Sequence, residues 1–253
     1  MIMDMFRLDG QVAVVTGGNR GLGLGIAAGL AEAGAQIVSV QRSDAAPALA
    51  ERVAAAGREL LVLPLDIGGA GAAERALEAT LERFGRADIL VNNAGVQRRH
   101  PVAEFPLDEF DEVLKVNLHS VFAFAQAFGR EMLRQGRGKI INVASLLSFQ
   151  GGITVPAYAA AKHGVAGMTK ALCNEWAGQG VNVNAIAPGY MDTDMTEALK
   201  ADPERSRAIG ERIPAGRWGR PDDLAGLAVF LASRAADYVH GQVIAVDGGW
   251  LAR

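Results

Sequence analysis

Cysteine is nearly absent from this chain: Cys173 stands alone among 253 residues, which excludes an internal disulfide framework. No stretch approaches the ~18 consecutive apolar residues that a membrane-spanning helix needs. Residues 1–9 carry Asp4, Arg7 and Asp9 and no long apolar run, so no secretory signal is expected. These absences predict a cytoplasmic protein without a membrane span.

Signs of a metal site or of a nucleic-acid partner are also missing. The four histidines are scattered without metal-ligand spacing, so no metal site is expected. The net charge of −3 gives no reason to expect nucleic acid or an anionic membrane as a partner. Apolar residues make up 50% of the chain, and there are 31 glycines but no repeat or linker. This composition favours one large α/β domain over residues 1–253.

Short apolar runs rich in β-branched residues alternate with helical patterns along most of the chain. Such runs are typical of strands that are buried on both faces of a parallel sheet. We predict strands at 12–16, 36–40, 59–65, within 88–95, and at 139–144, 181–187 and 242–246. Helical spacing predicts helices at 24–33, 45–56, 72–84, 107–135, 156–177 and 221–231. The alternation predicts a doubly wound Rossmann fold, a seven-stranded parallel sheet with helices on both faces.

The segment from Ser145 to Lys162, S-L-L-S-F-Q-G-G-I-T-V-P-A-Y-A-A-A-K, carries the clearest chemistry. Tyr158 precedes Lys162 by four residues in a helical pattern, and positions i and i+4 share one helix face. A neighbouring ammonium favours the phenolate, so Lys162 together with a second nearby positive charge is expected to lower the pKa of Tyr158 from about 10 towards neutrality. With the Ser145 hydroxyl holding the oxygen, these side chains predict a site that moves a proton on or off a carbinol oxygen. The alternative is an ordinary Tyr–Lys pair on a solvated helix face.

A glycine-rich turn, G-G-N-R-G-L-G at 17–23, joins the first strand to the first helix. Glycines let the backbone approach a phosphate, and a helix N-terminus presents free N–H groups to it. The second strand ends at Gln41 and Arg42 without the acidic residue that would accept a ribose 2′-hydroxyl. Arg42 and Arg20 could instead bind a 2′-phosphate, which favours NADP over NAD. The alternative is that both arginines are solvated surface groups.

Two further features allow more than one interpretation. Asn117 stands inside the helical pattern 107–135, either as a satisfied core amide or as a placed functional group. Residues 190–218 lose the alternation of strands and helices and are rich in charge. We expect this segment to be a lid over the ligand end of the sheet, the alternative being a plain surface insertion.

Six motifs now stand in order: T-G-x-x-x-G-x-G at 16–23, N-N-A-G at 92–95, Asn117, Ser145, Y-x-x-x-K at 158–162 and P-G at 188–189. Together they resemble the short-chain dehydrogenase/reductase family over the whole chain. The resemblance implies that Tyr158 is the acid/base, that Lys162 lowers its pKa, that Ser145 orients the substrate oxygen and that Asn117 holds a water behind Lys162. The nicotinamide cofactor it implies would be contacted by Gly17, Asn19, Arg20, Gly21, Leu22, Gly23, Gln41, Arg42, Asp66, Ile67, Asn93, Ala94, Gly95, Tyr158, Lys162, Ile186, Pro188, Gly189, Met191 and Thr193.

Within that family the C-terminal half resembles members that act on sugar acids, through the stretches 144–158, 174–177, 184–191, 212–219 and 246–253. Such a substrate has a carboxylate, which Arg98 or Arg99 of the V-Q-R-R-H loop could bind bidentately. Ser148 and Gln150, with Ser145 and Tyr158, could bond its hydroxyls or carboxylate. The alternative for the loop residues is a polar surface without a ligand.

The resemblance also implies a homotetramer, with the tail 250–253 reaching a neighbouring subunit, and a place in uronate catabolism. Two other functions are considered. One is a broader keto-reductase for acyl thioesters or hydrophobic ketones, which the polar residues of the 96–100 and 148–150 loops disfavour. The other is a non-catalytic scaffold that only binds a dinucleotide, which the intact Ser145, Tyr158 and Lys162 set disfavours.

Overall fold

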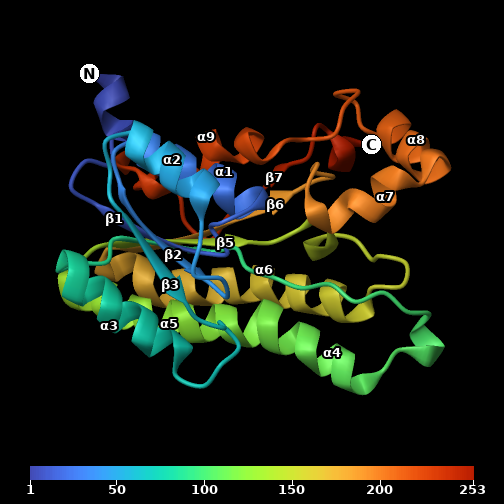
Figure 1. The fold of residues 1–253 in the computed structure, drawn as a ribbon, viewed down its shortest axis with the longest axis horizontal. Coiled ribbons are helices and arrows are strands. Elements are labelled where there is room, and N and C mark those ends of the chain that lie inside the picture. Colours follow the sequence, from blue (N-terminus) through green and yellow to red (C-terminus); the bar gives the residue numbers. More distant parts are fainter.

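The computed structural model describes residues 1–253, except for the side chain of Ala198. Its centre is one sheet of seven parallel strands in the order β3-β2-β1-β4-β5-β6-β7 (Figure 1). The strands are β1 Val12–Thr16, β2 Gln36–Gln41, β3 Leu60–Pro64, β4 Ile89–Asn92, β5 Gly138–Val143, β6 Val181–Pro188 and β7 Val243–Val246. The predicted fold class is therefore confirmed.

Helices cover both faces of this sheet (Figure 1). One face carries α1 Gly21–Glu32, α2 Pro47–Ala55 and α9 Ala225–Ala232, and the other carries α3 Ala72–Phe84, α4 Leu107–Leu114, α5 Ser120–Gln135 and α6 Pro156–Trp176. Successive side chains of a strand point to opposite faces. In β1, accordingly, Ala13 and Val15 pack in the core under α1, whereas Val12 and Val14 pack in the core under α3 and α5. The unbroken apolar run of β1 is thus explained by burial on both sides.

The strand order reverses at β1, because the chain passes from β3 at one edge back to β4 beside β1. Loops that leave two such strands in opposite directions open a crevice at their carboxyl ends. Here the two loops are fastened together: the backbone N–H groups of Asn93 and Ala94 donate to the Thr16 hydroxyl at 2.9 and 3.0 Å. The Asn93 side-chain amide also donates to the carbonyls of Thr16 and Gly17.

The helix expected over 107–135 is interrupted by a π-helical turn, Lys115–His119, between α4 and α5. Asn117 lies in this turn with no exposed surface. Its side-chain amide donates to the carbonyl of Val96 at 2.6 Å, and its carbonyl oxygen accepts from the Val96 N–H at 2.9 Å. The turn therefore places an amide where it satisfies the main chain of the loop after β4.

None of the described helices is both long enough and apolar enough to cross a bilayer.

Two short helices, α7 Glu197–Ala201 and α8 Pro203–Arg212, lie beyond the carboxyl ends of the strands (orange in Figure 1). Backbone hydrogen bonds join the two ends of the segment that carries these helices. Asp192 donates its N–H to the Gly219 carbonyl at 2.8 Å, and Gly219 donates to the Tyr190 carbonyl at 2.9 Å. Residues 192–218 therefore leave and rejoin the sheet at one place.

Candidate active site

A cavity of about 1160 Å³ opens at the carboxyl ends of the strands, below α7 and α8. It brings together most of the residues that the sequence predicts for the site. The predicted residues that line it are Gly17, Asn19, Arg20, Gly21, Leu22, Gln41, Arg42, Asp66, Ile67, Asn93, Ala94, Gly95, Arg98, Arg99, Ser145, Gln150, Tyr158, Lys162, Pro188, Gly189, Met191 and Thr193.

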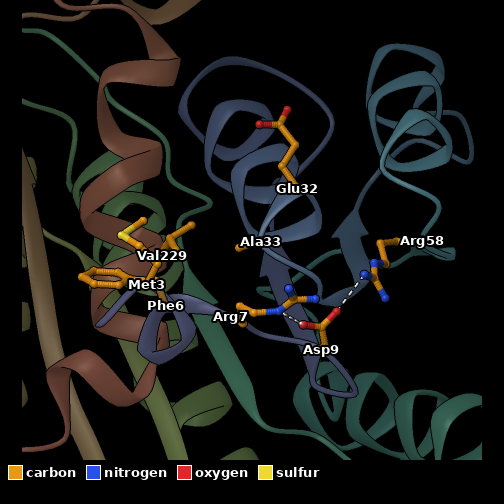
Figure 2. Close-up of a pocket in the computed structure, with 8 residues that line it drawn as sticks. All are labelled: Met3, Phe6, Arg7, Asp9, Glu32, Ala33, Arg58 and Val229. Atoms are coloured by element: carbon orange, nitrogen blue, oxygen red, sulfur yellow. Dashed lines mark hydrogen bonds and ion pairs between the residues drawn. The ribbon is translucent and has the colours of Figure 1, made fainter. Parts of the chain in front are cut away.

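A smaller hollow of about 320 Å³ lies near the N-terminus and contains none of the predicted residues (Figure 2). Its charged groups are already paired, since Asp9 accepts from Arg7 at 2.7 Å and from Arg58 at 2.9 Å. Of these two cavities, only the large one is lined by residues that the sequence predicts for the site.

The glycine-rich turn fits the pyrophosphate of a dinucleotide. Gly17 and Gly21 have positive φ angles of +69° and +51°, which side chains other than glycine rarely adopt. At Gly23 an added Cβ would lie 2.0 Å from the Gly17 carbonyl oxygen, so only glycine lets α1 begin this close to β1. No side chain caps the N-terminus of α1. Its N–H groups are thus free to bind an anion in the cavity.

The end of β2 carries a cation and no carboxylate. Gln41 is buried, and its amide donates to the Ser43 carbonyl and the Ala45 carbonyl at 3.1 and 3.0 Å, which fixes the loop that follows. Arg42 and Ser43 then line the cavity. Arg20 lines it too, but pairs with Asp194 at 3.3 Å. The end of β2 thus offers a guanidinium for a phosphate and no carboxylate for a ribose 2′-hydroxyl.

Tyr158 and Lys162 share one face of α6, as their spacing predicts. The Lys162 ammonium lies 5.5 Å from the centre of the Tyr158 ring and donates to the Val143 carbonyl at 2.5 Å. Only 3% of Lys162 is exposed, and this burial lowers its pKa to about 8. The ammonium is thus held in place by the end of β5, beside the phenol.

Burial dominates the pKa of Tyr158 in the protein alone. Burial is the largest influence and raises this pKa above its ordinary value, while a hydrogen bond with Ser145 and the charge of Arg99 lower it. In the protein alone, loss of hydration disfavours the phenolate more than the neighbouring groups favour it. The fall towards neutrality that we expect with a second positive charge beside Lys162 stays a prediction. The phenol is protonated at neutral pH and is poised to donate.

Arg98 and Arg99 are in different electrostatic states, although they are adjacent. Arg98 pairs with Glu112 at 2.9 Å and lies 3.7 Å from Glu109. Arg99 has no carboxylate partner in the described part of the chain and donates to the Gln97 side chain at 3.2 Å. The surrounding protein and the charge of Arg205 lower the pKa of Arg99. Arg99 is thus the arginine that remains available for an anion.

The structure adds residues that sequence reasoning missed. Trp250 is 6% exposed and packs against Tyr190 in a tilted arrangement, with ring centres 4.6 Å apart. Its indole N–H donates to the Gln150 carbonyl oxygen at 3.2 Å, and the Arg212 guanidinium lies 3.9 Å from its ring centre. In this structure Trp250 forms a wall of its own chain's cavity. Its sequence signal is weak, because an aromatic residue near a terminus shows no periodicity.

Four predicted residues do not line the cavity. Ser148 is 8% exposed and donates to the Lys162 carbonyl at 2.7 Å, so its hydroxyl supports α6 and is not directed at a substrate. Asn117 binds the main chain of Val96 with both ends of its amide, and its part in holding a water stays a prediction. Gly23 and Ile186 are buried.

Comparison with known proteins agrees with this arrangement. A family model described as enoyl-(acyl carrier protein) reductase matches residues 17–251. The 2-dehydro-3-deoxy-D-gluconate 5-dehydrogenases of Dickeya dadantii and Escherichia coli are 53% and 52% identical to this chain, each over 100% of both chains. A solved gluconate 5-dehydrogenase from Burkholderia cenocepacia, in complex with NADP and tartrate, is 44% identical with a TM-score of 0.95 over 100% of both chains. The chain therefore belongs to the short-chain dehydrogenase/reductase family.

Proposed function

We propose that this chain is an NADP(H)-preferring oxidoreductase that interconverts 2-dehydro-3-deoxy-D-gluconate and the corresponding 2,5-diketo acid. The observation that carries the proposal is the position of Arg99, an arginine without a carboxylate partner in a cavity that also holds Tyr158, Ser145 and Lys162. A hydrophobic ketone would leave this cation unneutralised. The names of the relatives that are just over half identical support the same substrate.

In the direction of reduction, the Ser145 hydroxyl would orient the ketone oxygen and Tyr158 would donate its proton to that oxygen. Lys162, fixed by Val143, would stabilise the phenolate that remains. Arg99 would bind the carboxylate, and Gln150, oriented by Trp250, a hydroxyl. Bound NADP(H) would supply or accept the hydride. The role we propose for Asn117 is to position the loop that carries Arg99.

The proposal is tested by following NADPH and NADH oxidation with the 2,5-diketo acid as substrate. We expect turnover with both cofactors, at a higher kcat/KM for NADPH. Turnover of an acyl thioester or a hydrophobic diketone at an equal kcat/KM would contradict the proposed substrate class. Tight NADPH binding without turnover of any ketone would instead support a scaffold.

A second candidate is gluconate 5-dehydrogenase, which the solved Burkholderia structure favours. The two substrates share a carboxylate and a reactive C5. They differ at C2, which is a hydroxyl in gluconate and a ketone in the deoxy acid, and at C3, which carries a hydroxyl only in gluconate. Competition between 5-ketogluconate and the diketo acid separates the candidates, since the preferred substrate has the larger kcat/KM. A larger value for 5-ketogluconate would reassign the enzyme.

Arg99→Gln is expected to raise the KM for the acid about ten- to hundredfold, because a hydrogen-bonded ion pair contributes about 1.5–3 kcal/mol. Arg98→Gln is the matched control on the adjacent residue, since Arg98 is already paired with Glu112. We expect its KM to change less than about threefold. Initial rates at saturating NADPH measure both values. An unchanged KM in Arg99→Gln would remove Arg99 from the substrate site.

Arg42→Ala is expected to raise the KM for NADPH about tenfold or more and to leave the KM for NADH unchanged, because only NADPH carries a 2′-phosphate. NADH serves as the internal control for folding and for the site. An equal rise in the KM for NADPH and for NADH would show that Arg42 does not bind the 2′-phosphate.

We further propose that residues 1–253 form one domain in which 190–218 is a substrate lid. The hydrogen-bonded ends of this segment and the cavity-lining residues Thr193, Leu199 and Ile209 support a lid over a plain insertion. A cytoplasmic homotetramer that serves uronate catabolism from pectin or alginate is the biological setting we propose. Exposed Leu107 and Phe122 on α4 and α5 offer apolar surface for subunit contacts, and light scattering of the purified protein measures the oligomer.

A further inference from the structure

Arg205 of α8 lines the same cavity as Arg99 and also lacks an ion-pair partner among the described residues. The charge of Arg205 lowers the pKa of Arg99, which places the two guanidinium groups within electrostatic reach of each other. Tyr158 and Tyr190 act on Arg99 in the opposite sense, so this cation lies near both phenols. Two like charges that converge on one cavity cost free energy unless an anion lies with them.

Three other cations of the segment around α8 do have carboxylate partners. On α8 itself, Arg207 pairs with Glu211 at 2.8 Å. Nearby, Arg217 pairs with Asp223 at 2.7 Å and Lys200 with Asp192 at 2.5 Å. Arg207 is two residues from Arg205 but does not line the cavity. Two cations of α8 line the cavity: Arg212 lies over the Trp250 ring, 3.9 Å from its centre, whereas Arg205 has neither a carboxylate nor an aromatic partner among the described residues.

We propose that Arg205 is a specificity-determining residue that holds the carboxylate of the substrate together with Arg99. This inference rests on the proposed function for the identity of the acid. A carboxylate has about four lone-pair sites on its two oxygens and can accept from two guanidinium groups at once. Because Arg99 belongs to the loop after β4 and Arg205 to α8, an acid bound by both would connect the 190–218 segment to the body of the sheet. A neutral polyol would leave the two cations unneutralised and would not make this connection.

The test measures binding by calorimetry, using the NADP⁺-loaded protein with D-gluconate as the acid and D-gluconamide as its neutral analogue. The variants are Arg205→Gln, Arg99→Gln, the double variant and Arg207→Gln as the matched control on α8. We expect the wild type to prefer gluconate, and Arg205→Gln to raise the Kd for gluconate about tenfold or more while leaving that for gluconamide unchanged. In the double variant the loss should be smaller than the sum of the single losses, since the two groups share one ligand.

The inference is overturned if Arg205→Gln and Arg207→Gln bind gluconate equally well, or if the wild type does not distinguish gluconate from gluconamide. The test needs no turnover. A protein that binds gluconate through Arg205 but does not convert the diketo acid would support the inference and contradict the proposed function. Arg205 is exposed, so the variants are expected to fold, and matching thermal transitions verify it.

Discussion

Tyr158→Phe is expected to lower kcat by about 10³-fold while leaving the Kd for NADPH within about threefold of the wild type. The substitution removes the proton donor and keeps the ring, which lies beside Lys162 with its ring centre 5.5 Å from the ammonium. The phenol is protonated in the protein alone, since burial raises its pKa. Stopped-flow and steady-state rates, with fluorescence titration of NADPH, separate the loss of chemistry from a loss of binding.

Tyr190→Phe is the matched control, because Tyr190 lines the same cavity and loses the same hydroxyl. Its ring packs between Trp218 and Trp250, so the role we assign to it is structural. We expect kcat to remain within about fivefold of the wild type, far from the 10²–10⁴-fold that general acid/base catalysis contributes. Equal losses in the two variants would mean that Tyr158 is not the proton donor.

Lys162→Met is expected to lower kcat by roughly 10²-fold or more, because the phenolate that forms on Tyr158 loses its neighbouring cation. The same change should stabilise the ligand-free protein at neutral pH. Burial lowers the pKa of Lys162 from 10.5 to about 8, so the protonated form of Lys162 destabilises the folded protein. The cost corresponds to ~3 kcal/mol and is partly offset by the hydrogen bond to Val143, which the variant lacks.

The sign of the pH dependence follows from that shift. Below about pH 8, Lys162 is charged in both the folded and the unfolded protein, so the folded protein bears the full free-energy cost of burying the ammonium. Between about pH 8 and 10.5 the unfolded chain holds the proton that the folded protein has lost, so the free energy of unfolding rises with pH. Urea unfolding of wild type and Lys162→Met at matched concentration should show their stabilities converging or crossing over this range. A constant difference would mean that Lys162 does not titrate there.

The parts of the fold that depend on local patterns were predictable. The helix expected at 72–84 forms with those bounds as α3, because Gly71 and Gly85 have φ angles of +67° and +72° on either side of it. The five residues of β1 are buried, as an unbroken β-branched run indicates. The π-helical turn at Lys115–His119 was not predictable from a local pattern, because the partner of Asn117 in that turn is Val96, 21 residues away.

The sequence by itself determined the fold class, the glycine turn and the shared helix face of Tyr158 and Lys162, since each rests on spacing within one element. Only the tertiary structure decided which polar side chains reach the cavity. Ser148 turns to the Lys162 carbonyl and Arg98 to Glu112, whereas Arg99 stays free and Trp250 forms the wall. The physical reason is that each of these polar groups could be satisfied by more than one partner. The partner it takes depends on which groups the folded sheet, loops and tail bring within reach.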